Sequence, residues 1–147
     1  MTCLVATREG VWADRRVSNG AAVYRPARKV VRGVGIVAAF CGDGSACVKA
    51  MRAVASGEAD PHALAEITEG LLVTDEGELW SLWGKLAERT PRREAFACGG
   101  SGYAEAQAFL SGAGACDPDT VRRALRYVAR VRSDCGDGVD GMLVGSR

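Results

Sequence analysis

The sequence predicts an α+β protein in which two β-sheets are stacked between layers of helices. Three observations lead to this prediction. Short β-prone runs fill the first third of the chain, two helical segments follow them, and strands return before a second pair of helices and a final strand. This order differs from the regular strand–helix alternation of a parallel α/β sheet, so we expect stacked sheets with helices on their outer faces.

Length and charge limit the classes of function. The chain has 147 residues, of which 48% are hydrophobic and 25% charged, and this composition is typical of one soluble domain over residues 1–147. It carries 19 Lys and Arg against 18 Asp and Glu. No long-range electrostatic field therefore favours nucleic acid or an acidic membrane surface, and we expect neither as a partner.

The cysteine pattern indicates a reducing compartment. Six cysteines lie among small apolar neighbours, no Cys-x-x-Cys pair occurs, and the only histidine is His62. This combination argues against a zinc site. Polar residues at 7–9 interrupt the first apolar run, so we expect no signal peptide or membrane span. We predict a cytoplasmic protein with free thiols.

Four β-prone runs make up the first third of the chain. They span residues 3–8, 11–16, 28–32 and 36–41. Glu9 and Gly10 join the first two runs at hairpin length. Residues 17–26 contain an Asn-Gly pair and a proline, which predicts a loop or an irregular strand. The fourth run is continuously apolar, which predicts a strand buried on both faces.

Two helices are expected in the next segment. Asp43 or Ser45 caps the first, whose apolar positions recur at helical spacing and which ends near residues 56–57. An Asp-Pro pair begins the second helix, at residues 61–68. This helix has only about two turns, because the run at 71–74 already has strand character.

The second half of the chain alternates in the same way. A second hairpin is expected from strands at 71–74 and 78–83, and a proline-broken connection at 84–93. A short buried strand, two helices and a last strand follow, at residues 95–98, 103–111, from 117–118 onwards, and 141–144. The last helix has an apolar stripe opposite a row of arginines, which we interpret as a solvated face.

Thr2 is the residue with the clearest catalytic potential. It is small enough for a methionine aminopeptidase to expose it, and an N-terminal threonine combines a nucleophilic hydroxyl with its own general base, the α-amine. That amine has a pKa of about 7.7–8.0, close to the optimum for a base at physiological pH. The alternative is an ordinary processed terminus.

Five stretches in matching order resemble the proteasome β-subunit family, especially the HslV-type bacterial peptidase. They are Thr-x-Leu-Val at residues 2–5, Asp-Arg-Arg-Val-Ser-Asn-Gly at 14–20, Arg-Lys-Val at 28–30, Phe-Cys-Gly-Asp-Gly at 40–44 and Cys-Gly-Gly-Ser-Gly-Tyr-Ala at 98–104. The likeness spans nearly the whole chain, and the five stretches together are more specific than any one of them.

The resemblance implies a four-layer αββα sandwich, the fold of the N-terminal-nucleophile (Ntn) hydrolases, here with a shortened second helix. It also implies a threonine-type endopeptidase that needs no metal or organic cofactor. The implied partners are a peptide or unfolded-protein substrate, further copies of the chain in a homo-oligomer such as a ring, and an ATP-dependent unfoldase.

Matching positions imply five catalytic residues. Thr2 attacks the scissile carbonyl, Lys29 holds positive charge beside it, and Asp14 pairs with the lysine. Gly42 matches the glycine whose backbone N–H stabilises the oxyanion, and Asp134 matches the acid that supports the terminal threonine. Without the resemblance, Asp14 and Lys29 are read as solvated strand charges, and Gly42 as a strand-to-helix turn.

The resemblance also implies substrate-binding positions. Ser18 and Gly20 match residues that bind the substrate backbone as an added β-strand. Five further positions are expected to line the first specificity pocket: Val17, Ala27, Phe40, Gly44 and Val48. The alternative for these five is an ordinary place in the core.

Two departures from the family pattern concern the surroundings of the nucleophile. Asp137 stands where the family has a supporting serine, and the serine of the Gly-Ser-Gly motif is shifted by one position, to Ser101. Two other functions stay open. One is a catalytically silent structural or assembly subunit that retains Met1, and the other is an amidase that uses Cys3 after loss of two residues.

Overall fold

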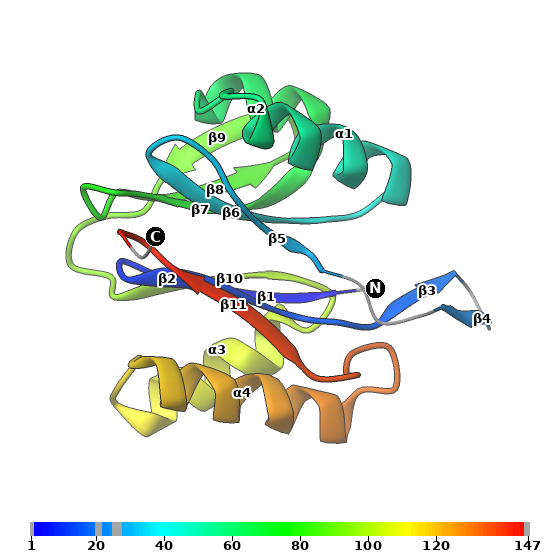
Figure 1. The fold of residues 1–147 in the computed structure, drawn as a ribbon. Helices are drawn as coiled ribbons and strands as arrows, with labels where there is room; N and C mark the ends of the chain where they lie inside the picture. The colour runs from blue at the N-terminus through cyan, green and yellow to red at the C-terminus, as the bar shows by residue number, and fades with distance from the viewer. Residues whose placement is uncertain (1, 20–21, 25–27, 146–147) are drawn as a thin grey trace.

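Four layers make up the structure, a computed structural model that describes residues 2–19, 22–24 and 28–145. Two antiparallel sheets lie face to face (Figure 1). Two helices cover the outer face of each sheet, in the pairs α1 (Gly44–Ala55) with α2 (Pro61–Ile67) and α3 (Tyr103–Ala113) with α4 (Pro118–Val131). The predicted α+β fold with an αββα order is confirmed. None of the described helices is both long and apolar enough to cross a membrane.

The N-terminal hairpin forms the centre of the four-stranded sheet. β1 (Cys3–Thr7) and β2 (Gly10–Asp14) pair antiparallel, and both strands are buried along their whole length. β10 (Phe96–Gly100) flanks β1 and β11 (Val139–Leu143) flanks β2. The central pair is buried because the other sheet covers one face and helices cover the other.

The second sheet has five strands in chain order. They are β5 (Val30–Arg32), β6 (Ile36–Cys41), β7 (Glu69–Thr74), β8 (Leu79–Trp83) and β9 (Leu86–Arg89). The prediction of an irregular connection at 84–93 is wrong for residues 86–89, which form β9. Gly84 and Lys85 have φ angles of 56° and 66° and form a two-residue turn that closes the β8–β9 hairpin. A lysine is uncommon in this conformation, so the sequence carries little signal for the turn.

Residues 17–26 contain a further short hairpin. β3 (Val17–Asn19) pairs antiparallel with β4 (Ala22–Tyr24). Of the two expectations for this segment, the irregular strand is therefore nearer to the structure than the loop. Figure 1 shows this hairpin projecting from the same end of the sheets as the N-terminus.

Aspartates begin three helices. Asp43, Asp60 and Asp117 each accept a hydrogen bond from a backbone N–H in the first turn of α1, α2 and α4. α2 has only seven residues, because the chain enters β7 at Glu69. The expected short helix at 61–68 is confirmed to within one residue.

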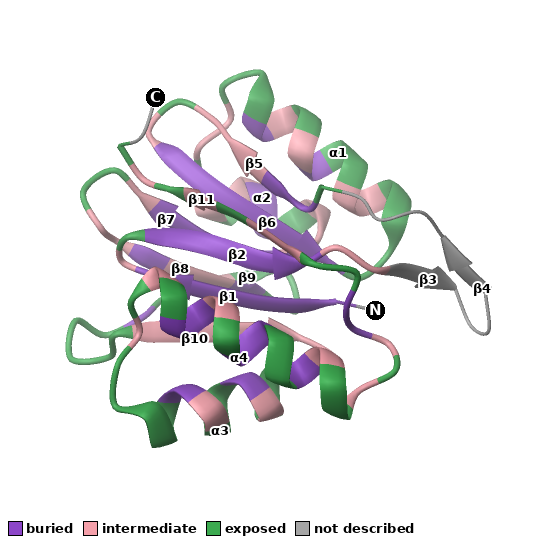
Figure 2. Cartoon of the chain, turned by 60° about the horizontal axis from the view of Figure 1, so that its bottom comes forward, coloured by how far each residue is buried: buried purple, intermediate pink, exposed green. Residues whose placement is uncertain are grey.

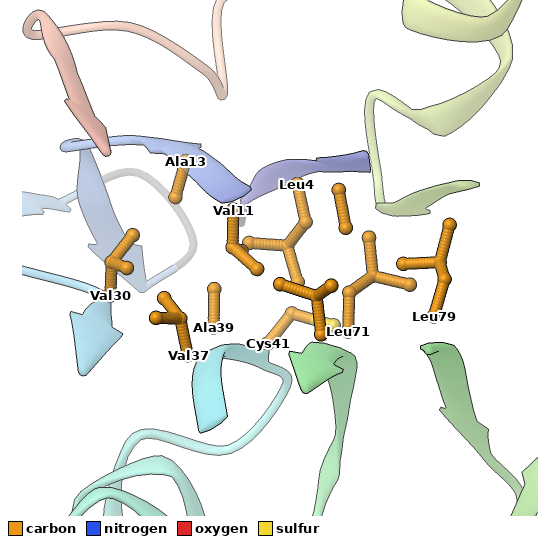
Figure 3. Close-up of a cluster of buried hydrophobic side chains, with 11 residues drawn as sticks. Leu4, Val11, Ala13, Val30, Val37, Ala39, Cys41, Leu71 and Leu79 are labelled. Atoms are coloured by element: carbon orange, nitrogen blue, oxygen red, sulfur yellow. The ribbon is translucent and has the colours of Figure 1, made fainter. Parts of the chain in front are cut away.

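Three buried clusters separate the layers. The first lies between the two sheets and contains Leu4, Val37 and Leu71 (Figure 3). The second lies between the four-stranded sheet and α3 and α4, around Trp12, and the third lies under α1 and α2, around Phe40. Figure 2 shows the buried residues concentrated in the sheets and the exposed residues on the outward faces of the helices.

Candidate active site

Three polar residues meet at one end of the sheets. Thr2 precedes β1, Asp14 ends β2, and Lys29 precedes β5 of the other sheet. The start of β1 lies beside the end of β2 because these strands are antiparallel, which places Thr2 next to Asp14. Thr2, Asp14 and Lys29 have relative exposures of 8%, 1% and 8%. The two sheets thus bring the three residues together in a site with little access to water.

Lys29 is the centre of the hydrogen-bond network. Its Nζ donates to Thr2 Oγ1 at 2.9 Å, to Asp14 Oδ1 at 3.1 Å and to the backbone oxygen of Arg16. Asp14 also accepts the backbone N–H groups of Cys3 at 2.8 Å and of Gly136 at 2.9 Å. A buried ion pair persists when additional hydrogen bonds satisfy the remaining polar positions, and these contacts meet that condition.

This geometry prepares the Thr2 hydroxyl for loss of its proton. Lys29 donates to Oγ1, so the proton of the hydroxyl points elsewhere and is free to leave toward a base. A positive charge at 2.9 Å favours the alkoxide over the hydroxyl. The effect is larger here than in water because both groups are buried. The Thr2 side chain therefore has the surroundings of an activated nucleophile.

A second network supports the Thr2 backbone. Ser101 Oγ donates to the carbonyl oxygen of Thr2 at 3.3 Å. Asp134 accepts both arms of the Arg132 guanidinium, at 2.8 and 2.9 Å. The hydrogen bonds from Arg132, and to a smaller extent from Ser101, lower the pKa of the Asp134 carboxyl to about 2. Asp134 is therefore ionised at neutral pH and lies near Ser101. The sequence did not single out Arg132.

The two departures from the family motif have different positions in the structure. Ser101 contacts Thr2, as described above. Asp137 instead forms a two-pronged ion pair with Arg16, with distances of 3.0 Å to Nε and 3.2 Å to Nη2. Its hydrogen bond to Arg16 lowers the pKa of the Asp137 carboxyl. The loop that carries Asp134 is thus attached to the end of β2 by a side-chain pair.

Gly42 lies in the turn between β6 and α1. Its φ of 102° belongs to a conformation that favours glycine. Gly42 is exposed, and its N–H has no acceptor among the residues that the structure describes. An unpaired N–H beside the start of a helix is well suited to bind an oxygen atom with negative charge.

Comparisons with known proteins bear on the fold. No protein-family model matches the chain, and no curated protein matches its sequence. Among solved structures, the eukaryotic HslV from Trypanosoma brucei is similar at a TM-score of 0.74 and 16% identity, over 96% of this chain and 98% of that chain. The chain therefore has the fold of HslV. BPH of Thiobacillus denitrificans is similar in complex with epoxomicin (TM-score 0.74, 12% identity) and without it (0.73, 13%), over 99% of each chain.

Within the HslV fold, the expected substrate-binding positions are only partly described. Gly44 and Val48 lie exposed on α1. The backbones of Val17 and Ser18 lie in β3. Two further expected positions, Gly20 and Ala27, lie outside the described residues.

Phe40 requires a correction. It is 2% exposed and belongs to the cluster under α1 and α2, with Ala50 and Leu64. Side chains alternate along a strand, so Phe40 points toward the helices of the HslV fold, away from the space between the sheets. This placement matches the alternative expectation for Phe40, an ordinary place in the core.

The next residue, Cys41, lies on the side of β6 that faces the other sheet. It is 7% exposed and belongs to the cluster between the sheets. Burial, followed by the charges of Glu69 and Cys47, raises the pKa of the Cys41 thiol to about 12, while Gly100 and Lys29 oppose the rise. The continuous apolar run of β6 hides which residues face which layer, so the sequence missed this position.

Proposed function

We propose that this chain is an HslV-like threonine-type endopeptidase that cleaves peptide bonds with Thr2 after removal of Met1. The observation that carries the proposal is the buried ammonium of Lys29, 2.9 Å from Thr2 Oγ1 and 3.1 Å from Asp14 Oδ1. Replacing a buried ion pair with apolar residues often leaves a protein equally stable or makes it more stable. A role in chemistry therefore explains the presence of this pair better than a contribution to stability does. Met1 itself lies outside the described residues.

In the proposed reaction, Thr2 Oγ1 attacks the carbonyl carbon and its proton passes to the free α-amine of Thr2. Lys29, held by Asp14, stabilises the developing alkoxide. The oxyanion of the tetrahedral intermediate accepts the N–H of Gly42. The C–N bond then breaks, the α-ammonium protonates the leaving amine, and an ester remains on Oγ1. Water, deprotonated by the same α-amine, hydrolyses the ester and restores Thr2.

Asp134 and Ser101 are proposed to orient the reacting residue. The α-amine and Oγ1 belong to one residue, so a hydrogen bond to the Thr2 carbonyl limits how both can rotate. Ser101 provides that bond, and Arg132 holds the Asp134 carboxylate in place near Ser101.

The proposed substrate is an extended segment of a peptide or an unfolded protein. Ser18 and Gly20 are proposed to bind its backbone as an added strand. The remaining pocket positions contain no ionisable side chain: Val17, Ala27, Gly44 and Val48. Burying an unpaired charge in such a pocket costs more binding free energy than burying one methylene group contributes. We therefore expect cleavage after apolar residues in preference to Lys, Arg, Asp or Glu.

The proposed setting is the cytoplasm, in a homo-oligomer that works with an ATP-dependent unfoldase. All six cysteines are free thiols, which supports a reducing compartment. Trp83 and Leu86 are each 72% exposed, which supports contact with another chain. The balance of 19 basic against 18 acidic residues supports partners other than nucleic acid or a membrane. The mechanism uses no metal or organic cofactor.

The variant Thr2→Ala tests the proposal. We expect peptide hydrolysis to fall by about 10³-fold or more, because no other group supplies both the nucleophile and its base. Lys29→Ala should lower kcat by about 10²-fold or more. Thr74→Ala is the matched control, since its hydroxyl accepts the Glu78 N–H at the far end of β7, and it should keep wild-type turnover.

Intact mass spectrometry gives an independent measurement. Wild-type protein should have lost one methionine and should gain the mass of one epoxomicin after incubation with that compound. Thr2→Ala should not gain it. Retained Met1 in the isolated protein, or unchanged turnover in Thr2→Ala with native circular dichroism, would contradict the peptidase mechanism.

A further inference from the structure

The loop of residues 133–138 touches the candidate site through its backbone. Gly136 N–H donates to Asp14 Oδ2 at 2.9 Å. The oxygen of Gly136 accepts the N–H groups of Arg15 at 3.0 Å and Arg16 at 2.9 Å. The position of this loop therefore decides whether the second oxygen of Asp14 is held, and Asp14 in turn holds Lys29.

Arg16 joins this loop to the site with its side chain. Its guanidinium donates to both oxygens of Asp137, at 3.0 and 3.2 Å, and to the backbone oxygen of Ser133. Its backbone oxygen accepts Lys29 Nζ. One residue thus contacts the loop at two places and the central lysine at a third.

The backbone of the loop explains why such an attachment is needed. Gly136, Asp137 and Gly138 have φ angles of 147°, 61° and 93°. Positive φ is unfavourable for most residues, and glycine, Asn and Asp adopt it more readily than the others. A Cβ built on Gly136 would lie 3.3 Å from Arg16 Nη2, so the guanidinium fills the space beside the glycine. The loop belongs to no helix or strand, and the two-pronged pair of Arg16 with Asp137 adds to its backbone hydrogen bonds.

We propose that Arg16 and Asp137 are positioning residues that hold the 133–138 loop so that Gly136 N–H stays on Asp14, Asp14 stays on Lys29, and Lys29 stays on Thr2 Oγ1. The part of this inference that concerns rate depends on the proposed peptidase function. The part that concerns the network does not. Asp137 thus has a positioning role of its own, through Arg16, although it does not serve as the supporting serine of the family motif.

The test compares two pairs of variants. Arg16→Ala and Asp137→Asn break the two-pronged ion pair between Arg16 and Asp137, which is called the fork below. Asparagine is chosen because it tolerates positive φ. Arg122→Ala and Asp119→Asn are the matched controls, because they break an exposed ion pair of 3.3 Å on α4. If Arg16→Ala fails to fold, the milder Asp137→Asn still provides the measurement.

Amide hydrogen exchange in the folded protein is the first measurement. We expect the protection of the Gly136 and Cys3 amides, both bonded to Asp14, to fall by about tenfold or more in Arg16→Ala. The same amides should change less than about twofold in the controls. Unchanged protection of Gly136 in both fork variants would overturn the proposal, whatever their activity.

Kinetics are the second measurement. A displaced lysine slows chemistry without removing contacts to the substrate, so kcat should fall about 10- to 100-fold while KM stays within about threefold. Loss of protection with wild-type kcat would overturn the positioning role. If the variants lose protection as expected but the wild-type protein cleaves no peptide, the peptidase function is refuted and the network inference stays supported.

Discussion

Moving a lysine and an aspartate out of water costs several kcal/mol per ion. Lys29 and Asp14 offset this cost with a direct contact of 3.1 Å and with hydrogen bonds to Thr2, Arg16, Cys3 and Gly136. Most of these partners are backbone groups, which do not change when side chains are replaced. The Thr2 hydroxyl is the exception among them, and it is a reactive group that accepts a hydrogen bond from the ammonium. The pair is thus arranged around Thr2 Oγ1.

Thiols with raised pKa values make the folded protein less stable at alkaline pH. Burial raises the pKa of Cys98 from 9.0 to about 12. Below pH 9 this thiol is protonated in the folded and unfolded chain alike. Between about pH 9 and 12 only the unfolded chain ionises, so the free energy of unfolding falls as pH rises. Cys98→Ala should make this fall shallower by up to about 1.4 kcal/mol per pH unit. Urea unfolding at several pH values between about 8 and 10.5 measures the slope.

Cys116→Ala is the control for this prediction. Cys116 lies in the surface loop between α3 and α4, where its thiol contacts the backbone oxygen of Ala95. Replacing Cys116 should change the dependence of the free energy of unfolding on pH less than replacing Cys98 does. Equal slopes in wild type and Cys98→Ala would show that the folded protein lets this thiol ionise.

Residues of the candidate site differ in how far the sequence reveals them. Thr2, Asp14 and Lys29 stand in short motifs with recognisable order, and the structure brings their side chains together. The role of Arg132 depends on a partner two positions away and on Ser101 in the turn between β10 and α3, so no local pattern marks it. Phe40 was misplaced because a strand buried on both faces has no polar residue to show its orientation.

At the scale of elements, β11 packs closely because Gly141 lacks a side chain. Gly141 is paired with Trp12 of β2, and a Cβ on Gly141 would lie 2.1 Å from Trp12 Cδ1. Trp12 is 1% exposed and packs under α4, so its ring cannot move away cheaply. Gly141→Ala should lower the free energy of unfolding by about 1–3 kcal/mol. Urea unfolding followed by circular dichroism measures this change.

Gly112 is the matched control because it lies in α3, where no atom of the described residues comes within 4 Å of the position that an added methyl group would take. Gly112→Ala should raise stability by about 0.5–1 kcal/mol, because alanine favours the helix and restricts the unfolded chain. If both variants lower stability equally, close packing of Trp12 is not the cause.

The elements themselves were predictable where local chemistry marks their ends. Asp43, Asp60 and Asp117 cap helices that the sequence places correctly. β9 was missed because Leu86–Arg89 is short and polar, and its hairpin depends on a lysine with positive φ. Pairing with β8 stabilises this strand, and that contact is not local to the segment.

At the scale of the whole molecule, the two sheets differ in width. The five-stranded sheet covers the four-stranded one, and β10 packs against β7 and β8. Trp83 and Leu86 are paired at the tip of the β8–β9 hairpin. By alternation they lie on the face that also carries Leu79 of the inter-sheet core. The helical layer covers the opposite face, where Trp80 contacts His62 and Arg89. The exposed apolar pair therefore belongs to the edge of the wider sheet.

This pair leads to a prediction about assembly. Two large apolar side chains at 72% exposure are costly to leave in water, and a second copy of the chain that covers them would account for their presence. We expect a homo-oligomer at micromolar concentration and a shift toward monomer in the double variant Trp83→Ser with Leu86→Ser. Val34→Ser is the control, because Val34 is 78% exposed and lies at the opposite edge of the same sheet, between β5 and β6. Light scattering coupled to size-exclusion chromatography measures the mass, and a wild-type monomer would refute the assembly.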